Sequence, residues 1–348
     1  MNYMSIKPKK LQPGDTVAIV SPSWGGPSMF PHIYKNGLKA LEELGLKVKE
    51  YPSAQKDADF LEDNPEFRAN DINYAFLDSD VKAIIASIGG NDSIRILPFL
   101  DIETIKNNPK IIMGYSDTTT LLTYLNQLGL VTLHGPSIMA GLSQYDSLGE
   151  DFHNHIKTLL FDNPEIYNYQ PYKSYIDGYP DWNNQANTGK VNEAADNSGW
   201  NWLQGNSVVQ GKLFGGNIEV MEFLKSTKFY PDEDFWNKKI FFLETSEEKP
   251  TPDQVKYMLR NYGMQGIFDK ISALLIGRPK EYSDTEKKDL DEVVLKIVKH
   301  EFGNQNLPII TNMDFGHTDP QWILPLGINA EVDCNKKEFK LTEQIFAD

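Results

Sequence analysis

The sequence is poor in the residues that build disulfides and metal sites. Only one cysteine, Cys334, occurs among 348 residues, so no intramolecular disulfide can form, which fits a reducing compartment. Six histidines are spread along the chain, and His153 and His155 form the one close pair. A His-x-His pair can bind zinc, but no third ligand is evident nearby, so we expect an exposed helix start instead. No metal site is predicted.

Long apolar runs and a surplus of positive charge are also absent. No segment approaches the ~20 consecutive apolar residues that span a bilayer, and the N-terminal residues lack the apolar core of a signal peptide. Acidic side chains outnumber basic ones by 49 to 34, which gives a net charge of -15. Such a field repels phosphate backbones, but a local pocket can still hold a small anion. We expect a cytoplasmic protein with neither a nucleic acid nor a membrane as partner.

Strands and helices alternate through the first part of the chain. Apolar runs at residues 16–20, 81–88 and 111–114 show no polar alternation, and helical spacing of apolar residues separates them. Such runs are typical of a parallel sheet covered by helices on both faces, so an α/β fold is predicted. Ligands bind beyond the C-terminal ends of the strands in open sheets of this kind. Three residues of interest follow such ends, namely Ser21, Gly90 and Ser116.

The stretch from residue 167 to residue 206 differs from the rest. It contains eight tyrosines and tryptophans among Asn, Gly and Asp, and it shows neither a helical nor a strand period. It is too aromatic for simple disorder, and long loops inside compact proteins are often functional. The stretch is therefore either an interdomain linker or a loop that covers the substrate. We expect an N-terminal domain over residues 1–166 and a C-terminal domain over residues 207–348.

Strand and helix patterns resume in the last part of the chain. Helix starts are indicated at Thr251 and Ser283, where Gln254 and Glu286 follow three residues later as in a capping box. The C-terminal residues are typical of a hairpin with a turn near residues 335–336. Apolar runs predict further strands at 208–213, 239–243, 271–276 and 308–311.

The residues around Ser116 predict a short strand, a sharp turn and then a helix. A turn of this kind presents a hydroxyl at a helix N-terminus, where free N–H groups and the helix dipole favour a developing negative charge. Ser116 is therefore a candidate nucleophile, although the G-x-S-x-G pattern is broken at Thr118. Helix N-capping is the alternative role, and it is the more frequent one for a serine at such a position.

Acyl transfer by a serine also needs a general base and a carboxylate that orients the base. His317 follows a strand and a glycine, which is where a base can reach a cleft. Glu244 follows four large apolar residues, so its carboxylate needs a buried partner. This partner is either a histidine that Glu244 orients or a salt bridge or helix cap. His134 could line the same site or make a structural hydrogen bond.

Gly89 and Gly90 end an apolar run and permit close approach of the backbone to a ligand. The N–H groups here, together with that of Asp117, could hold an oxyanion. Tight turns use the same pair of residues, so the pair is not specific by itself. Its spacing matches neither a Walker loop nor G-x-G-x-x-G, so these nucleotide-binding motifs are not indicated.

Six motifs together resemble the LD-carboxypeptidase family of serine peptidases, and within it the microcin C self-immunity (MccF-like) branch. They occur in family order between about residues 11 and 327. The motifs are Leu-Gln-Pro-Gly-Asp (11–15), Ile-Gly-Gly-Asn-Asp (88–92), Gly-Tyr-Ser-Asp (114–117), Gly-Gly-Asn (215–217), Leu-Glu-Thr-Ser (243–246) and Phe-Gly-His-Thr (315–318).

This resemblance implies a Rossmann-like N-terminal domain with a parallel sheet and a smaller, β-rich α/β C-terminal domain. It also implies a catalytic triad of Ser116, Glu244 and His317, without a metal or a cofactor. The expected oxyanion hole lies at Gly90 and Asp117. Proteins of this family are commonly homodimers, so we expect a homodimer here.

The substrate differs between the branches of the family. LD-carboxypeptidases release a terminal D-residue from a murein tetrapeptide, whereas MccF-like relatives cleave the amide that joins an aminoacyl group to a nucleotide-like moiety. The Gly-Gly-Asn-Asp motif and the tryptophan-bearing stretch favour the second branch. The expected substrate contacts are Asn91, Trp182, Trp200 and Trp202, with Trp200 and Trp202 favoured among the tryptophans.

We therefore predict a serine hydrolase that acts on a small peptidyl- or aminoacyl-nucleotide such as a microcin C-type compound. The alternative enzyme is a murein tetrapeptide LD-carboxypeptidase. The alternative outside enzymes is a small-molecule binding protein, because two α/β domains around a cleft also suit binding alone.

Overall fold

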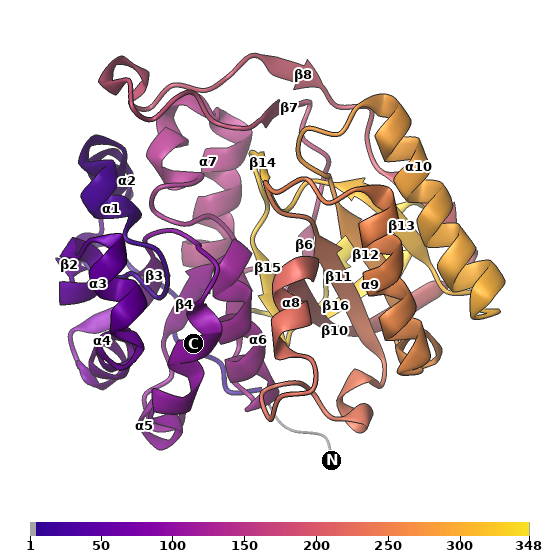
Figure 1. Ribbon diagram of the computed structural model, residues 1–348, viewed down its shortest axis with the longest axis horizontal. Helices are drawn as coiled ribbons and strands as arrows, with labels where there is room; N and C mark the ends of the chain where they lie inside the picture. Colours follow the sequence, from indigo (N-terminus) through magenta and orange to yellow (C-terminus); the bar gives the residue numbers. More distant parts are fainter. Residues whose placement is uncertain (1–4, 348) are drawn as a thin grey trace.

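The computed structural model describes residues 5–347 and contains two large sheets side by side, each accompanied by helices (Figure 1). The first sheet has six strands in the order β15-β5-β4-β3-β1-β2. Five of them are parallel, as predicted, and β15 is antiparallel to its neighbour β5. Their bounds are β1 (Thr16–Val20), β2 (Lys47–Glu50), β3 (Val81–Ala86), β4 (Ile111–Gly114), β5 (Thr132–His134) and β15 (Leu324–Leu326).

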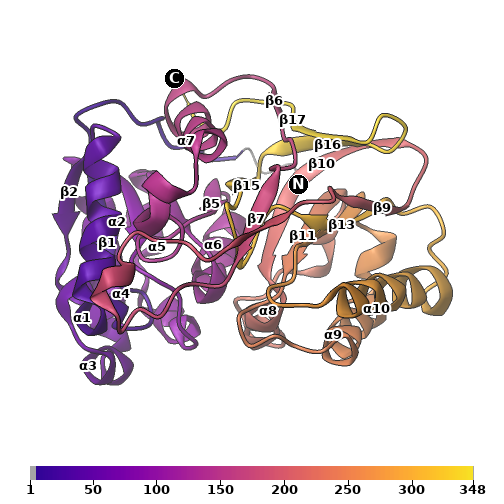
Figure 2. The same ribbon diagram turned by 90° about the horizontal axis from the view of Figure 1, so that it is seen from above.

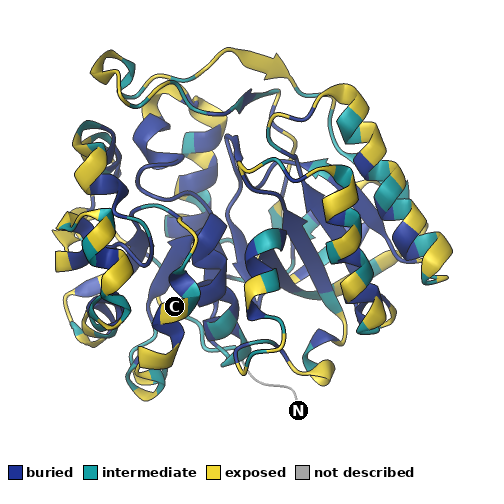
Figure 3. Ribbon diagram, in the orientation of Figure 1, coloured by how far each residue is buried: buried dark blue, intermediate teal, exposed yellow. Residues whose placement is uncertain are grey.

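The inner strands of this sheet are buried at successive positions (Figure 3). Successive side chains of a strand point to opposite faces, so both faces of the sheet are covered, as the apolar runs predicted. The edge strand β2 is mostly exposed. The helices of this part are α1 (Gly26–Met29), α2 (Pro31–Glu43), α3 (Ala58–Asp63), α4 (Pro65–Leu77), α5 (Ile102–Asn107), α6 (Thr119–Gln127) and α7 (Glu150–Lys157).

The second sheet has eight strands in the order β6-β17-β16-β10-β11-β12-β13-β9. Its parallel centre is formed by β10 (Val208–Asn217), β11 (Lys239–Glu244), β12 (Ala273–Gly277) and β13 (Ile309–Met313). The predicted C-terminal hairpin is confirmed, and it consists of β16 (Asn329–Asp333) and β17 (Glu338–Leu341). Strands and helices also alternate in this part, through α8 (Ile218–Leu224), α9 (Pro252–Met264) and α10 (Asp284–Leu295).

Both predicted capping boxes are present. Thr251 accepts a hydrogen bond from the N–H of Gln254 at the start of α9, and Ser283 does the same with Glu286 at the start of α10. In each box the side chain at the third helical position bonds back to the cap residue, which satisfies a second N–H group. The starts of these two helices are therefore fixed by local sequence.

The aromatic stretch 167–206, which we call the brace, is not an irregular loop, because it contains the short strands β6 to β9. Its first and last strands, β6 (Tyr167–Asn168) and β9 (Asn201–Gln204), are the two edge strands of the second sheet. Between them, β7 (Ser174–Asp177) and β8 (Ala194–Asp196) form a small sheet with β14 (Thr318–Asp319). Figure 2 shows this segment running across the molecule, from the side of the first sheet near α2 to β9 at the edge of the second sheet. Strands of two to four residues are too short to show a period in the sequence.

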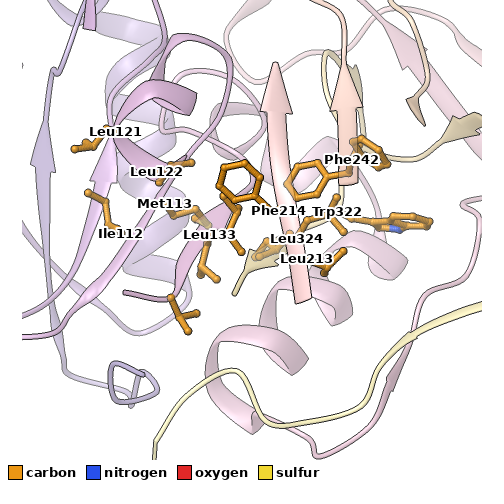
Figure 4. Close-up of a cluster of buried hydrophobic side chains, with 14 of the residues drawn as sticks. Ile112, Met113, Leu121, Leu122, Leu133, Leu213, Phe214, Phe242, Trp322 and Leu324 are labelled. Atoms are coloured by element: carbon orange, nitrogen blue, oxygen red, sulfur yellow. The ribbon is translucent and has the colours of Figure 1, made fainter. Parts of the chain in front are cut away.

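One strand from the second half of the chain completes the first sheet. Leu324 and Leu326 of β15 pair with β5. The other neighbour of β5 is β4, the strand that leads to Ser116. Buried side chains of both sheets, such as Met113 and Phe214, gather in one cluster around β15 (Figure 4). The domain limits at residues 166 and 206 remain a prediction. That prediction did not include a strand from the C-terminal part of the chain in the first sheet.

Within residues 5–347, no helix has both the length and the apolar character needed to cross a membrane.

Candidate active site

Ser116 stands at a sharp turn between β4 and a helix. Its φ of 57° lies in the left-handed region, which residues other than glycine rarely adopt. A short 3₁₀ turn (Ser116–Thr118) follows and leads directly into α6. The N-cap positions of the turn and of α6 are Tyr115 and Thr118, and neither side chain makes a capping hydrogen bond, so Ser116 does not occupy a cap position. Strained backbone of this kind is typical of functional serines on strand-to-helix turns.

His317 and Glu244 form a buried pair, as the motifs predicted. Glu244 is the last residue of β11, and His317 lies in the segment that follows β13. The Nδ1 atom of His317 lies 2.6 Å from Oε2 of Glu244. The carboxylate therefore fixes which nitrogen carries the proton and leaves Nε2 for chemistry.

A second carboxylate lies beside the same imidazole. Oε2 of Glu247 is 2.9 Å from Nε2 of His317, in a direction that does not make a hydrogen bond. Burial lowers the pKa of His317, but the carboxylates of Glu244 and Glu247 outweigh burial and raise the pKa to about 10. The contact with His317 in turn lowers the pKa of Glu247 to about 2.

The serine and the imidazole are neighbours through Tyr115. The ring of Tyr115 lies with its centroid 4.9 Å from that of His317, and Tyr115 directly precedes Ser116. In the part of the chain that the structure describes, Nε2 of His317 has no hydrogen-bond partner, so it is not hydrogen-bonded to Ser116. Catalytic hydrogen bonds are often long or poorly aligned until a substrate is bound, so this geometry is compatible with a triad.

Gly89 and Gly90 form the wall next to the serine. A Cβ atom at Gly89 would lie 2.9 Å from Oγ of Ser116, so only glycine lets the backbone approach this closely. Gly90 has a φ of 150°, and a Cβ atom there would collide with Oγ of Ser23. The same Ser23 oxygen accepts a hydrogen bond from the N–H of the exposed Asn91 at 3.2 Å. The backbone of this loop is thus held against the candidate nucleophile Ser116.

Buried polar contacts fix both sides of this wall. The guanidinium of Arg68 is fully buried and donates to both carboxylate oxygens of Asp92, at 2.7 and 2.8 Å. On the other side, Oδ2 of Asp117 accepts from the N–H of Ser93 at 2.8 Å. The carbonyl oxygen of Asp117 accepts from the Ser93 hydroxyl at 2.6 Å. These contacts hold the two segments whose N–H groups are expected to form the oxyanion hole.

Trp182 is connected to this site through Tyr179. The ring centroids of Trp182 and Tyr179 are 5.5 Å apart, and Trp182 also packs on Phe30 at 5.5 Å. The hydroxyl of Tyr179 lies 3.2 Å from that of Tyr115 and donates to Oδ2 of Asp319 at 2.8 Å. Trp182 is therefore linked through Tyr179 to Tyr115, the residue before the candidate nucleophile Ser116.

Trp200 and Trp202 lie elsewhere on the brace. The indole N–H of Trp200 donates to Oδ2 of the buried Asp314 at 2.9 Å, and its ring packs against Trp322. Trp202 packs against Trp200 and lines an open hollow next to the turn of the C-terminal hairpin. Neither has a described ring contact or hydrogen bond with Ser116, so their placement does not support the preference for them.

The structure also decides between roles expected for two other histidines, and the one for His155 was wrong. His155 is not at an exposed helix start but buried, because Nε2 accepts from the N–H of Ile323 and Nδ1 contacts the Tyr167 hydroxyl at 2.7 Å. Burial lowers the pKa of His155 to about 3, so it is a neutral structural residue. Two roles were left open for His134. It is buried with its ring beside Tyr115, and neither ring nitrogen has a hydrogen-bond partner in the described structure, so the structural hydrogen bond is not observed.

No three His, Cys, Asp or Glu side chains between residues 5 and 347 are arranged to hold a metal. Four residues near the site were not predicted from the sequence, namely Tyr115, Tyr179, Glu247 and Asp319. Three of these lie within three residues of a triad member, which is a signal that could have been used. Tyr179 lies in the brace, far from the triad in sequence, and nothing in the sequence ties it to Asp319.

Comparison with known proteins identifies the family of this chain. Residues 17–135 match the LD-carboxypeptidase N-terminal domain, and residues 210–332 match the LD-carboxypeptidase C-terminal domain. The microcin C7 self-immunity protein MccF of Escherichia coli is 28% identical over 95% of this chain and 94% of its own length. A probable murein peptide carboxypeptidase of Bacillus subtilis is 27% identical over 97% of this chain and 93% of its own.

Solved structures show the same relationship. An MccF-like protein from Streptococcus pneumoniae in complex with AMP has a TM-score of 0.83 and 31% identity, covering 94% of this chain and 98% of that one. MccF in complex with aspartyl sulfamoyl adenosine has a TM-score of 0.84 and 25% identity, covering 98% of this chain and 99% of that one. The chain therefore belongs to the LD-carboxypeptidase family of serine peptidases.

Proposed function

We propose that this serine hydrolase cleaves the amide that joins an aminoacyl or peptidyl group to a nucleotide-like moiety, as in microcin C-type compounds. The observation that carries the proposal is the pair of packed rings of Trp182 and Tyr179. The hydroxyl of Tyr179 is hydrogen-bonded to that of Tyr115, the residue before Ser116. Its support among relatives is that MccF binds aspartyl sulfamoyl adenosine and that an MccF-like protein binds AMP.

In the proposed reaction, Ser116 attacks the acyl carbon while His317 takes the hydroxyl proton. The backbone N–H groups of Gly90 and Asp117 stabilise the oxyanion. His317 then gives the proton to the leaving nitrogen, and an ester between Ser116 and the acyl group remains. Water hydrolyses this ester with His317 as the base, which restores the free serine. Glu244 orients the imidazole and stabilises its charged form throughout.

Recognition of the nucleotide part is assigned to Trp182 of the brace and to Phe30 at the start of α2. The flat faces of Trp182 and Phe30 suit stacking of a nucleobase, which contributes ~1–3 kcal/mol per stacked base in single-strand binders. Asn91 is exposed beside the glycine wall, where its side chain can contact the substrate. Such contacts bind substrate without taking part in the chemistry.

Cleavage of a murein tetrapeptide is the second candidate function. It is favoured by the match to both LD-carboxypeptidase domains and by the similarity to the Bacillus subtilis murein peptide enzyme. Purified protein should be assayed in parallel with a murein tetrapeptide and with an aminoacyl sulfamoyl adenosine. Faster cleavage of the tetrapeptide would show that a murein peptide, not an aminoacyl nucleotide, is the preferred substrate.

The alternative of a binding protein without activity is tested by a serine-reactive fluorophosphonate. In a hydrolase the reagent should label Ser116, and the label should disappear in Ser116→Ala. A protein that binds the nucleotide compound but takes no label would be a binding protein.

A cytoplasmic location and a homodimer belong to the same proposal. Their support is the resemblance to the family and, for the location, the single cysteine. Light scattering of the purified protein at several concentrations measures the assembly, and a monomer throughout would contradict the homodimer.

A further inference from the structure

Two carboxylates, not one, face the imidazole of His317. Glu244 contacts Nδ1 at 2.6 Å, as a triad requires, and Glu247 lies 2.9 Å from Nε2. Nε2 is the nitrogen that must accept the proton of a serine hydroxyl. Glu247 has no part in the triad, so its place beside this nitrogen needs another explanation.

Glu247 differs from the other acidic groups of the site in being open to solvent. Its side chain is 53% exposed, whereas Glu244 and Asp319 are buried. Lys280, in the segment after β12, acts electrostatically on both Glu247 and Asp319. The groups that act directly on His317 or on Glu247 are Glu244, Asp319, Tyr115, His134 and Lys280, and Tyr179 contacts two of them, Tyr115 and Asp319.

This excess of negative charge has a consequence for the protein without substrate. Both carboxylates raise the pKa of His317, so without substrate they favour the imidazolium form, which carries a proton on each nitrogen. A protonated Nε2 cannot accept the hydroxyl proton of Ser116. Activity near neutral pH therefore requires that something neutralise or displace Glu247 when substrate binds.

A cation on the substrate would do this. In an aminoacyl nucleotide, the α-ammonium group is attached to the carbon next to the acyl carbon that Ser116 attacks. Bound with that acyl carbon at the serine, the ammonium group lies within reach of a carboxylate that touches the catalytic imidazole. An ammonium group paired with Glu247 removes one of the two charges that hold the proton on His317.

We propose that Glu247 recognises a positively charged group on the acyl side of the substrate and that this pairing releases His317 to act as the base. As the ammonium group binds, His317 loses its Nε2 proton to solvent. The freed nitrogen then accepts the hydroxyl proton of Ser116 as the bond from Oγ to the acyl carbon forms. This inference rests on the proposed function, because it assumes an aminoacyl substrate.

The test compares alanyl sulfamoyl adenosine with propionyl sulfamoyl adenosine, which lacks the amino group. At about pH 7, wild-type protein should cleave the alanyl compound with a kcat/KM roughly tenfold or more above that of the propionyl compound. In Glu247→Gln the ratio should approach one, mainly because kcat/KM for the propionyl compound rises. A ratio that is unchanged in Glu247→Gln, or an equal loss for both compounds, would overturn the proposal.

Glu103→Gln is the matched control, because Glu103 is an exposed residue of α5 and undergoes the same chemical change. Its kinetics should equal those of the wild type. Since Glu247 is half exposed, the Gln variant should fold normally, which thermal unfolding checks.

Labelling of Ser116 by a neutral fluorophosphonate gives a second readout that needs no turnover. The labelling rate of the wild type should still rise above about pH 8, whereas that of Glu247→Gln should level off at lower pH. Identical profiles would overturn the role of Glu247. If the wild type cleaves neither nucleotide, the proposed function fails, and the labelling profiles still decide whether Glu247 controls the protonation of His317.

Discussion

Tyr179 donates a hydrogen bond to Oδ2 of Asp319 at 2.8 Å, and this bond ties the brace to the strand that follows His317. The Tyr179 hydroxyl also lies 3.2 Å from that of Tyr115, the neighbour of the candidate nucleophile. One phenol thus contacts the two segments that carry the serine and the histidine. The relative position of these segments depends on a residue that belongs to neither half of the molecule.

Ser116→Ala should lower kcat by several orders of magnitude, because covalent catalysis is lost. His317→Ala should be similarly severe, and the double variant should be hardly worse than either single one, since the residues act as one unit. Steady-state kinetics measure this, with thermal unfolding to confirm the fold. Substantial activity left in Ser116→Ala would show that the triad is assigned wrongly.

Gly90→Ala should lower kcat by ~10²–10³, the usual effect of losing an oxyanion donor. The added Cβ atom would collide with Ser23 and displace the loop next to the serine. Gly14→Ala is the matched control, because Gly14 also has a positive φ but open space around it. It should cost about 1–2 kcal/mol of stability and leave kcat unchanged. Equal kcat values in the two variants would contradict the oxyanion assignment.

Trp182→Ala should raise KM for an aminoacyl-nucleotide roughly tenfold or more, from the ~1–3 kcal/mol of a stacked base, with less effect on kcat. Trp200→Ala should leave KM unchanged but lower the free energy of unfolding by ~1–3 kcal/mol, because it removes a partner of the buried Asp314. Kinetics and urea unfolding of both variants separate these effects. A higher KM in Trp200→Ala alone would instead support Trp200 as the substrate contact, as the sequence had suggested.

Activity should survive exhaustive dialysis against EDTA. The part of the chain that the structure describes contains no cluster of side chains suited to a metal, and the proposed chemistry needs none. Hydrolysis rates before and after dialysis, and after addition of zinc, check this. Loss with EDTA and recovery with zinc would contradict the serine mechanism.

Acid should destabilise the protein partly through His155. Its pKa is lowered to about 3 in the folded protein, so below about pH 6.5 the unfolded chain binds a proton that the folded protein does not. The stabilising effect of the neutral ring is therefore present above about pH 6.5 and is lost as the pH falls toward about 3. His155→Gln should show a smaller loss between about pH 7 and 5, by ~1–2 kcal/mol in urea unfolding.

The exposed His300 provides the comparison for this measurement. His300→Gln should keep the pH dependence of the wild type. If His155→Gln has the same pH dependence as the wild type, the ring of His155 is not the group that resists protonation.

The strands that the sequence predicted are those with continuous apolar runs. β1, β3 and β4 lie in the centre of the first sheet, where burial on both faces leaves a plain signal. The pair of Glu244 and His317 was also predicted, because a carboxylate after an apolar strand needs a buried partner and the motifs named the histidine.

Features that depend on distant contacts could not be predicted. The bond from Tyr179 to Asp319 spans 140 positions, and the sequence contains no pattern that links the two. β15 has only three residues and includes Pro325, which argues against a strand unless neighbouring structure imposes one. The contact between Glu247 and His317 depends on how the turn after β11 folds back, which local sequence does not determine.

The return of β15 to the first sheet makes the two halves of this enzyme inseparable. While the chain is being synthesised, β5 remains a bare edge until residues 324–326 have emerged, and a bare edge invites pairing with other chains. A cut within residues 167–206 would leave two fragments that still share a sheet, with serine and histidine in place. Fragments expressed apart would each lack a partner strand, so neither half can serve as an independent module.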